Sequence, residues 1–217
     1  MPGKYRIAVI GSGMAGLSTG ARLSERQEVE VYEAEFQPGY LSTGRSAAAL
    51  HMPFVNDVVH ALTLGSVDFC PSPPKGFPRL ARPVPFVLYS DHVHRSLIEE
   101  YLDRWSGSCG WLTRLDRDDL HRLVPSFRPP TQHGSLDSRS MAVDVAEMPG
   151  GFRKMFLENG GVLNTKERIT DITQSSGGWS LGVRNRWHSF DLIVNAAGAW
   201  ADQVAERCGV RKLGITP

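Results

Sequence analysis

Lys4-Tyr5-Arg6-Ile7-Ala8-Val9-Ile10-Gly11-Ser12-Gly13-Met14-Ala15-Gly16 is a short apolar run that ends in three closely spaced glycines. The run predicts a buried β-strand, and the GxGxxG spacing predicts a tight turn into a helix from Met14 to about Glu25. In such a turn Gly11 permits the sharp bend, Gly13 lets the backbone approach a pyrophosphate and Gly16 lets the helix pack on the strand. The amide groups at the start of the helix then face the phosphates.

A second predicted strand, Val29 to Tyr32, ends at the acidic residue Glu33. An acid at the end of the second strand accepts hydrogen bonds from the ribose of an adenosine. Strand, helix, second strand and acid follow one another in the order that a dinucleotide-binding α/β domain requires. The alternative is an ordinary glycine turn between a strand and a helix.

The bulk composition excludes several classes of function. The chain has 217 residues and a net charge of +1, which predicts neither nucleic-acid binding nor attraction to an anionic membrane. Cys70, Cys109 and Cys208 are far apart, so we expect free thiols and neither a disulfide framework nor a zinc site. His92 and His94 are interpreted as solvated surface, and no metal site is predicted. Without a signal peptide or an apolar membrane span, we expect a cytoplasmic protein, with the inner-membrane surface as the alternative.

The chain divides into an α/β part over residues 1–52 and 145–217 and a different part over residues 53–144 that interrupts it. An inserted piece of this kind is common where a nucleotide-binding domain carries a substrate domain. The predicted helices are Arg45 to Met52, Val55 to Phe69, His92 to Trp105, a helix capped by Asp116 with Leu120 and Leu123 on its inner face, and Met148 to Asn159. The predicted strands are Phe86 to Tyr89, Val162 to Thr165, Arg168 to Ile172, Trp179 to Val183 and Trp187 to Val194.

Two further stretches distinguish FAD from NAD. They are Ser42-Thr43-Gly44-Arg45-Ser46-Ala47-Ala48 and Val194-Asn195-Ala196-Ala197-Gly198-Ala199-Trp200-Ala201-Asp202. At these residues the chain resembles the D-amino-acid oxidase superfamily of FAD-dependent oxidoreductases, and within it the bacterial D-amino-acid dehydrogenases of the D-arginine type. The resemblance runs from about residue 4 to 217. It implies a Rossmann-like FAD-binding domain with an inserted, incomplete α+β substrate domain.

The resemblance also implies which residues bind the cofactor. The loop from Ser42 to Ala49 would wrap the pyrophosphate and pass beside the flavin, where Arg45 offsets phosphate charge. A backbone contact to adenine is expected near Ile169. The full set of expected FAD-binding residues is Gly11, Ser12, Gly13, Met14, Ala15, Gly16, Glu33, Ala34, Ser42, Thr43, Gly44, Arg45, Ser46, Ala47, Ala48, Ala49, Ile169, Ala196, Ala197, Gly198 and Trp200.

The implied reaction is oxidation of a small amine or D-amino acid by hydride transfer to flavin N5, after which water hydrolyses the imine. The chain departs from the family pattern at the substrate side. In this chain Ala49 stands where the family has a histidine beside the flavin, and Phe54 stands where it has a tyrosine. Val84 stands near the position of the family's acid that selects a cationic side chain. D-arginine is therefore not the expected substrate. His51 is the candidate catalytic residue, with a structural histidine as the alternative.

Other polar residues have plainer interpretations. Arg79 and Arg82 flank a predicted strand and can face a substrate carboxylate, but we expect both to be surface arginines. Asp116, Asp118 and Asp119 are typical of helix capping rather than of a catalytic pair.

Family members are longer than this chain, so we expect an N-terminal fragment that retains FAD weakly and turns over little by itself. Exposed strand edges then favour self-association or a partner chain that supplies the missing C-terminal half. Two alternatives stay open at this point. One is an NAD-dependent dehydrogenase, and the other is a degenerate flavoprotein remnant without activity.

Overall fold

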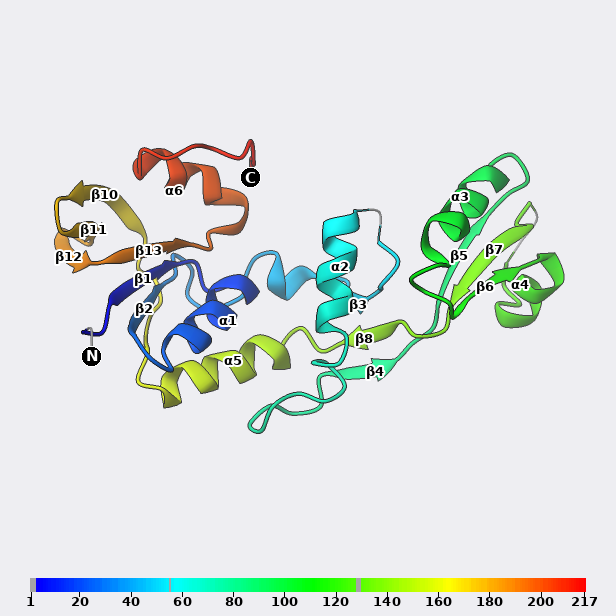
Figure 1. Ribbon diagram of the computed structural model, residues 1–217, viewed down its shortest axis with the longest axis horizontal. Coiled ribbons are helices and arrows are strands. Elements are labelled where there is room, and N and C mark those ends of the chain that lie inside the picture. The colour runs from blue at the N-terminus through cyan, green and yellow to red at the C-terminus, as the bar shows by residue number, and fades with distance from the viewer. Residues whose placement is uncertain (1–2, 55, 128–129) are drawn as a thin grey trace. The chain divides into compact units, whose positions relative to one another are not determined.

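The computed structural model describes residues 3–54, 56–127 and 130–217. Two compact units make up the chain (Figure 1). The first unit comprises Met1–Ala47, Lys75–Pro78 and Val145–Pro217, and the second comprises Ala48–Pro74 and Arg79–Asp144. The role of the second unit as a substrate domain stays a prediction.

A parallel sheet with the strand order β13-β1-β2-β9 forms the centre of the first unit. β1 (Arg6–Ile10) pairs with β2 (Glu28–Tyr32) and β13 (Leu192–Asn195), and β9 (Val162–Asn164) pairs with β2. The last four residues of β1 are buried, as expected for an inner strand of a parallel sheet. This strand order is the Rossmann arrangement, which confirms the predicted fold class.

Two helices of the first unit, α1 (Met14–Leu23) and α5 (Glu147–Glu158), pack against each other (Figure 1). Gly20 of α1 permits this close approach, because a Cβ there would lie 3.1 Å from Val31 and 3.5 Å from the Phe156 ring. The Phe156 side chain is fully buried. The packing therefore anchors α1, and with it the glycine turn that precedes it, on the sheet.

The antiparallel strands β10 (Ile169–Ser175), β11 (Gly178–Val183) and β12 (Arg186–Phe190) form a separate sheet of the first unit. Their buried side chains join those of the parallel sheet and of α6 (Ala201–Arg207) in one core. A short 3₁₀ helix, η2 (Gly198–Trp200), connects β13 to α6. The core thus fixes β10 and α6 beside the ends of β1 and β2.

The second unit contains two three-stranded antiparallel sheets with the orders β3-β8-β4 and β5-β7-β6. Its strands are β3 (Ala49–Leu50), β4 (Ala81–Pro83), β5 (Phe86–Ser90), β6 (Leu112–Leu115), β7 (His133–Asp137) and β8 (Met141–Val143), and its helices are α2 (Asp57–Ser66), α3 (Arg95–Trp105) and α4 (Arg117–Leu123).

The predicted helix from Arg45 to Met52 is wrong. The structure has a short 3₁₀ helix, η1 (Thr43–Arg45), followed by β3, whose Ala49 and Leu50 pair with Ala142 and Met141 of β8. Pairing with a strand that lies far away in the sequence overrides the helix propensity of the alanines.

The predicted strand from Trp187 to Val194 is also wrong, because it is two strands with a break at Asp191. The backbone N–H of Asp191 donates to Arg6 O (2.8 Å), and its carboxylate accepts from Arg6 N (2.7 Å). These bonds turn the chain from the antiparallel β12 into the parallel β13.

Helix boundaries in the second unit follow their caps. Asn56 caps α2 by accepting from the backbone of Val58 and Val59, and Val55, where the sequence predicts the start of this helix, lies outside the described residues. Asp116 caps α4 in a capping box with Asp119, as predicted. Leu120 is fully buried, but the expected inner position of Leu123 is wrong, because that side chain is 50% exposed.

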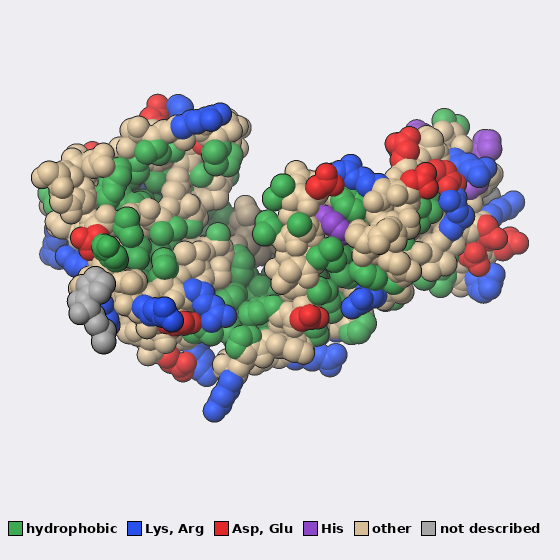
Figure 2. Space-filling model, in the orientation of Figure 1, with side chains coloured by type: hydrophobic (Ala, Val, Ile, Leu, Met, Phe, Trp, Pro, Cys, Tyr) green, Lys and Arg blue, Asp and Glu red, His purple; other side chains and the backbone are tan. Residues whose placement is uncertain are grey.

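Free cysteines are confirmed at Cys70, Cys109 and Cys208. Among the described residues, no helix is long and apolar enough to cross a membrane, and no cluster of three metal-ligating side chains occurs. Charged side chains of both signs are interspersed on the face seen in Figure 2, which agrees with the small net charge.

Candidate dinucleotide site

The glycine turn between β1 and α1 has the geometry that its sequence predicts. Gly11 has φ +102°, and a Cβ at this position would collide with the carbonyl oxygen of Ala196. A Cβ at Gly16 would collide with the carbonyl oxygen of Gly11. Because neither position can hold a side chain without moving backbone, the two glycines allow the turn after β1, helix α1 and the segment at Ala196, directly after β13, to approach one another closely.

The N-terminus of α1 lies next to the loop that contains Thr43. Gly13 precedes the helix without a side-chain cap among the described residues, and the backbone N–H of Met14 donates to Thr43 Oγ1 (3.1 Å). Backbone amides of Ala15 and Gly16 belong to the first turn, where no carbonyl of the helix itself can satisfy them. This helix end is therefore suited to an anion such as a phosphate.

Glu33 follows β2, and its carboxylate is held by the glycine turn. It accepts hydrogen bonds from Ser12 N (2.9 Å) and Ser12 Oγ (2.7 Å), and its other oxygen accepts from Glu35 N (2.9 Å). Ser12 is fully buried. These bonds fix the carboxylate beside the turn, where it can accept hydrogen bonds from ribose hydroxyls.

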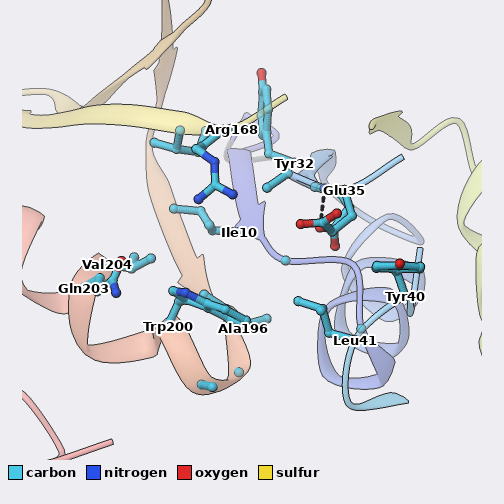
Figure 3. A pocket seen from close by; sticks show the side chains of 18 of the residues that line it. Ile10, Tyr32, Glu35, Tyr40, Leu41, Arg168, Ala196, Trp200, Gln203 and Val204 are labelled. Carbon is cyan, nitrogen blue, oxygen red and sulfur yellow. Dashed lines mark hydrogen bonds between the residues drawn. The ribbon is translucent and has the colours of Figure 1, made fainter. Parts of the chain in front are cut away.

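A pocket of about 200 Å³ opens at this edge of the first unit (Figure 3). Eleven of the predicted cofactor-binding residues line it: Gly11, Gly13, Glu33, Ala34, Ser42, Thr43, Ile169, Ala196, Ala197, Gly198 and Trp200. The other ten lie outside its wall: Ser12, Met14, Ala15, Gly16, Gly44, Arg45, Ser46, Ala47, Ala48 and Ala49. Whether each of these residues contacts the cofactor stays a prediction.

Several lining residues were not predicted from the sequence, notably Tyr32, Tyr40, Arg168, Val204 and Arg207. They come from different segments, and only the folded chain brings them to one pocket. Burial and a hydrogen bond from its hydroxyl to Glu30 (2.8 Å) raise the pKa of Tyr32. Tyr32 therefore stays a neutral hydroxyl at physiological pH.

Arg45 does not line the pocket. Its guanidinium lies over the ring of Tyr40, 5.3 Å from the ring centroid, and Tyr40 in turn packs on Phe36. Arg45 therefore orders the loop through a cation–π contact. The predicted offset of phosphate charge by Arg45 stays a prediction.

His51, the candidate catalytic residue, lies in the second unit next to the buried carboxylate of Asp137. One oxygen of Asp137 accepts from Trp111 Nε1 (2.8 Å) and Arg139 N (3.0 Å). The other oxygen accepts from Ser140 Oγ (2.7 Å) and lies 3.0 Å from His51 Nδ1. Burial opposes the ionisation of Asp137, but these hydrogen bonds outweigh it and hold the pKa of its carboxyl below the ordinary value.

The second ring nitrogen of His51 also has a partner, since Nε2 lies 3.1 Å from the Tyr101 hydroxyl. Burial, followed by the charge of Asp137, raises the pKa of Tyr101, so its hydroxyl keeps its proton at physiological pH. The His51 side chain is 13% exposed and packs on Phe86, with ring centroids 4.5 Å apart. Any direct contact of His51 with a substrate would have to replace one of these partners.

The remaining polar candidates have structural partners. Arg79 Nε donates to the carbonyl oxygen of Ala81 (3.1 Å), and Arg82 is an exposed residue of β4. His94 is exposed and lies 2.7 Å from the carboxylate of Asp91.

The sequence profile of the family described as FAD dependent oxidoreductase (DAO) matches residues 6–217. The chain belongs to this family. The family's cofactor is FAD, which confirms the FAD prediction and argues against the NAD alternative. The residues present fit this cofactor, because the pocket joins Gly11 and Gly13 of the glycine turn, which leads into α1, with an acid at the end of β2.

Glycine oxidase of Geobacillus kaustophilus (strain HTA426) is 24% identical over 250 residues, which cover 100% of this chain and 60% of that enzyme. Its crystal structure superposes with a TM-score of 0.85 at 17% identity and covers 96% of this chain and 60% of its own. L-proline dehydrogenase from P. horikoshii gives a TM-score of 0.82 at 20% identity, over 98% of this chain and 57% of its own.

L-α-glycerophosphate oxidase from Mycoplasma pneumoniae, solved with FAD bound, gives a TM-score of 0.81 at 16% identity over 94% of this chain and 57% of its own. These likenesses show a shared fold. This chain of the FAD-dependent oxidoreductase family thus spans about three-fifths of the length of the relatives that it matches.

Proposed function

We propose that the first unit holds the ADP half of FAD, and that the chain is part of an oxidase or dehydrogenase for a small amine or amino acid, with D-amino acids as the expected class. The observation that carries this proposal is the pocket of the first unit. It joins the glycine turn, the fixed carboxylate of Glu33 and the small residues Ala196 to Gly198 in one wall. The family match over residues 6–217 supports it.

Each part of this wall has a distinct task in the proposal. The first turn of α1 binds the pyrophosphate through its backbone N–H groups, beside the Thr43 hydroxyl that already accepts from Met14 N. Glu33 accepts the ribose hydroxyls, since Ser12 and Glu35 hold its two oxygens in place. The loop of small residues from Ser42 to Ala49 leads away from this end toward the flavin.

Bound FAD would supply a two-electron acceptor for the hydride on the substrate carbon beside nitrogen. The protein then aligns that carbon and excludes water. His51 stays the catalytic candidate of the second unit. Since Asp137 and Tyr101 occupy both of its ring nitrogens, we infer that it acts on a substrate only through the Tyr101 hydroxyl.

We further infer that additional polypeptide completes the site, either a longer chain or a partner. The chain spans 60% of glycine oxidase. In the second unit, Val58 and Leu62 of α2 leave apolar side chains 67% and 66% exposed. Apolar side chains exposed side by side on a helix are typical of a surface that another segment covers.

A second candidate function is a flavoprotein remnant that binds FAD but performs no oxidation. Ala49 and Phe54 favour it, because they lack the imidazole and the hydroxyl that the family pattern has there. The Phe54 side chain is 45% exposed, and as a phenylalanine it has no polar group to offer a substrate.

Isolation of the protein from its native cells tests the proposal. Intact mass, flavin content and anaerobic bleaching of the flavin band by a panel of amines and D-amino acids would be measured together. We expect bound FAD, and bleaching by at least one amino acid. Bound FAD that no amine or amino acid bleaches would support the remnant and overturn the catalytic proposal.

A further inference from the structure

Arg168 immediately precedes β10, and its side chain lines the pocket of the first unit. Figure 3 shows it reaching into the cavity toward Ile10. Within the described ranges its guanidinium makes no hydrogen bond or ion pair with the protein. Arg207, in the same wall, instead donates to the carbonyl oxygen of Ile169 (2.7 Å). Arg168 is therefore the pocket arginine whose donors remain available to a ligand.

The carboxylate of the neighbouring Glu167 is paired with an arginine other than Arg168. Glu167 forms an ion pair with Arg184 Nε (3.1 Å), and Arg184 also donates to the carbonyl oxygen of Lys166 (2.9 Å). Arg184 thus neutralises the adjacent carboxylate. No carboxylate of the described residues forms an ion pair with Arg168.

The position of Arg168 corresponds to the base end of the ligand, an inference that rests on the proposed function. The glycine turn marks the pyrophosphate and Glu33 marks the ribose, so the base lies beyond Glu33, away from the turn. In Figure 3, Arg168 and Val204 lie on the side of the cavity opposite Tyr40 and Leu41. Ile172 and Val204 contribute apolar side chains to the lining of the same pocket.

We propose that Arg168 is a specificity-determining residue for the adenine ring, which it covers with its planar guanidinium against the apolar wall of Ile172 and Val204. A guanidinium stacks on an aromatic face and can donate to the ring nitrogens of a purine, which are acceptors. The larger ring system of a purine gives more contact than a pyrimidine. Arg168 thereby selects adenine-containing dinucleotides by contact with the base rather than with the phosphates.

The test compares the 217-residue chain with Arg168→Gln, Arg168→Lys and the control Arg186→Gln, which alters an exposed arginine of β12 outside the pocket. Kd is measured for FAD by equilibrium dialysis and for ADP and CDP by competition. We expect both Arg168 variants to weaken FAD and ADP about three- to tenfold, the range of a cation–π contact, and to weaken CDP less. The Arg186→Gln control should bind like the wild type.

Three results would overturn the assignment of Arg168. They are unchanged affinity for FAD and ADP in Arg168→Gln, full affinity in Arg168→Lys, and an equal loss for ADP and CDP, which would place the contact on the phosphates. A wild-type chain that binds ADP but not FAD would overturn the proposed function alone, since the ADP data still test Arg168. A wild-type chain that binds neither ligand would overturn both.

Discussion

Ser12 donates two hydrogen bonds to one carboxylate oxygen of Glu33, from its backbone N–H at 2.9 Å and from its hydroxyl at 2.7 Å. A fully buried residue of the glycine turn thus holds the acid that ends β2. The hydrogen bonds of Ser12 thus join the glycine turn and the acid that follows β2 in the folded chain. The acid is therefore preorganised, which reduces the entropy lost on binding.

Replacement of this acid tests its role directly. Glu33→Gln keeps the size of the side chain but removes the charge that ribose hydroxyls and Ser12 share. We expect the Kd for FAD to rise about ten- to a hundredfold, because a hydrogen bond to a charged group contributes about 1.5–3 kcal/mol. Flavin titration measures it. Glu158→Gln, on the exposed surface of α5, is the control, and equal affinity in both variants would show that Glu33 does not contact the cofactor.

Two glycine-to-alanine changes should act in opposite directions. Gly11→Ala places a Cβ against Ala196 O at a positive φ, and we expect the free energy of unfolding to fall by about 1–3 kcal/mol or more. Gly65→Ala adds a Cβ with nothing within 4 Å in α2, and we expect a gain of about 0.5–1 kcal/mol. Thermal and denaturant unfolding compare them. A stable Gly11→Ala variant would refute the close approach of Gly11 and Ala196.

The buried network around Asp137 predicts a pH dependence of stability. Its carboxyl has a lowered pKa in the folded state. Its contribution is therefore complete above the ordinary aspartate pKa of about 3.9 and is lost as the pH falls through the lower folded value. Asp137→Asn should lower the free energy of unfolding by about 2–3 kcal/mol at pH 7, because charged hydrogen bonds are lost.

Denaturant unfolding between pH 3 and 7 measures this effect, with the exposed Asp68→Asn as control. The Asp137→Asn variant should lose less stability on acidification than the wild type. The same acid sensitivity in both proteins would mean that Asp137 is not ionised in the folded state.

Asp202 is a residue that the sequence did not single out. Its carboxylate accepts from the backbone N–H groups of Leu213 (2.7 Å), Gly214 (2.7 Å) and Ile215 (2.9 Å). These bonds, the one from Leu213 first, hold the pKa of Asp202 below its ordinary value. The segment 213–215 should therefore loosen as the pH falls through that lowered pKa.

Hydrogen exchange of the peptide over residues 208–217 measures this loosening. Asp202→Asn should exchange faster at neutral pH than the wild type, while Glu206→Gln, which only breaks an exposed pair with Lys212, should not. Unchanged exchange in Asp202→Asn would show that the carboxylate does not anchor the segment.

Local spacing made the geometry of the glycine turn and the place of Glu33 beside it predictable from the sequence. Gly11, Gly13, Gly16 and Glu33 act within one strand–helix–strand unit, so their order along the chain nearly fixes their geometry. The local preference of Ala49 and Leu50 for helix did not predict their structure, because pairing with β8 overrides it. Nor did local spacing predict the break at Asp191, whose bonds to Arg6 come from the other end of the chain.

The second unit was the least predictable part. Asp137, His51 and Tyr101 come from three distant segments, and no spacing in the sequence signals that they meet. Arg168 looked like an ordinary strand residue for the same reason. Its place in the pocket depends on how β10 packs against the ends of β1 and β2.

Titration of the purified 217-residue chain with FAD and with NAD shows whether the pocket of the first unit is an FAD site. We expect saturable binding of FAD that ADP displaces and that Glu33→Gln weakens, with no comparable binding of NAD. Binding of NAD in preference to FAD, or no binding of FAD at all, would contradict this expectation.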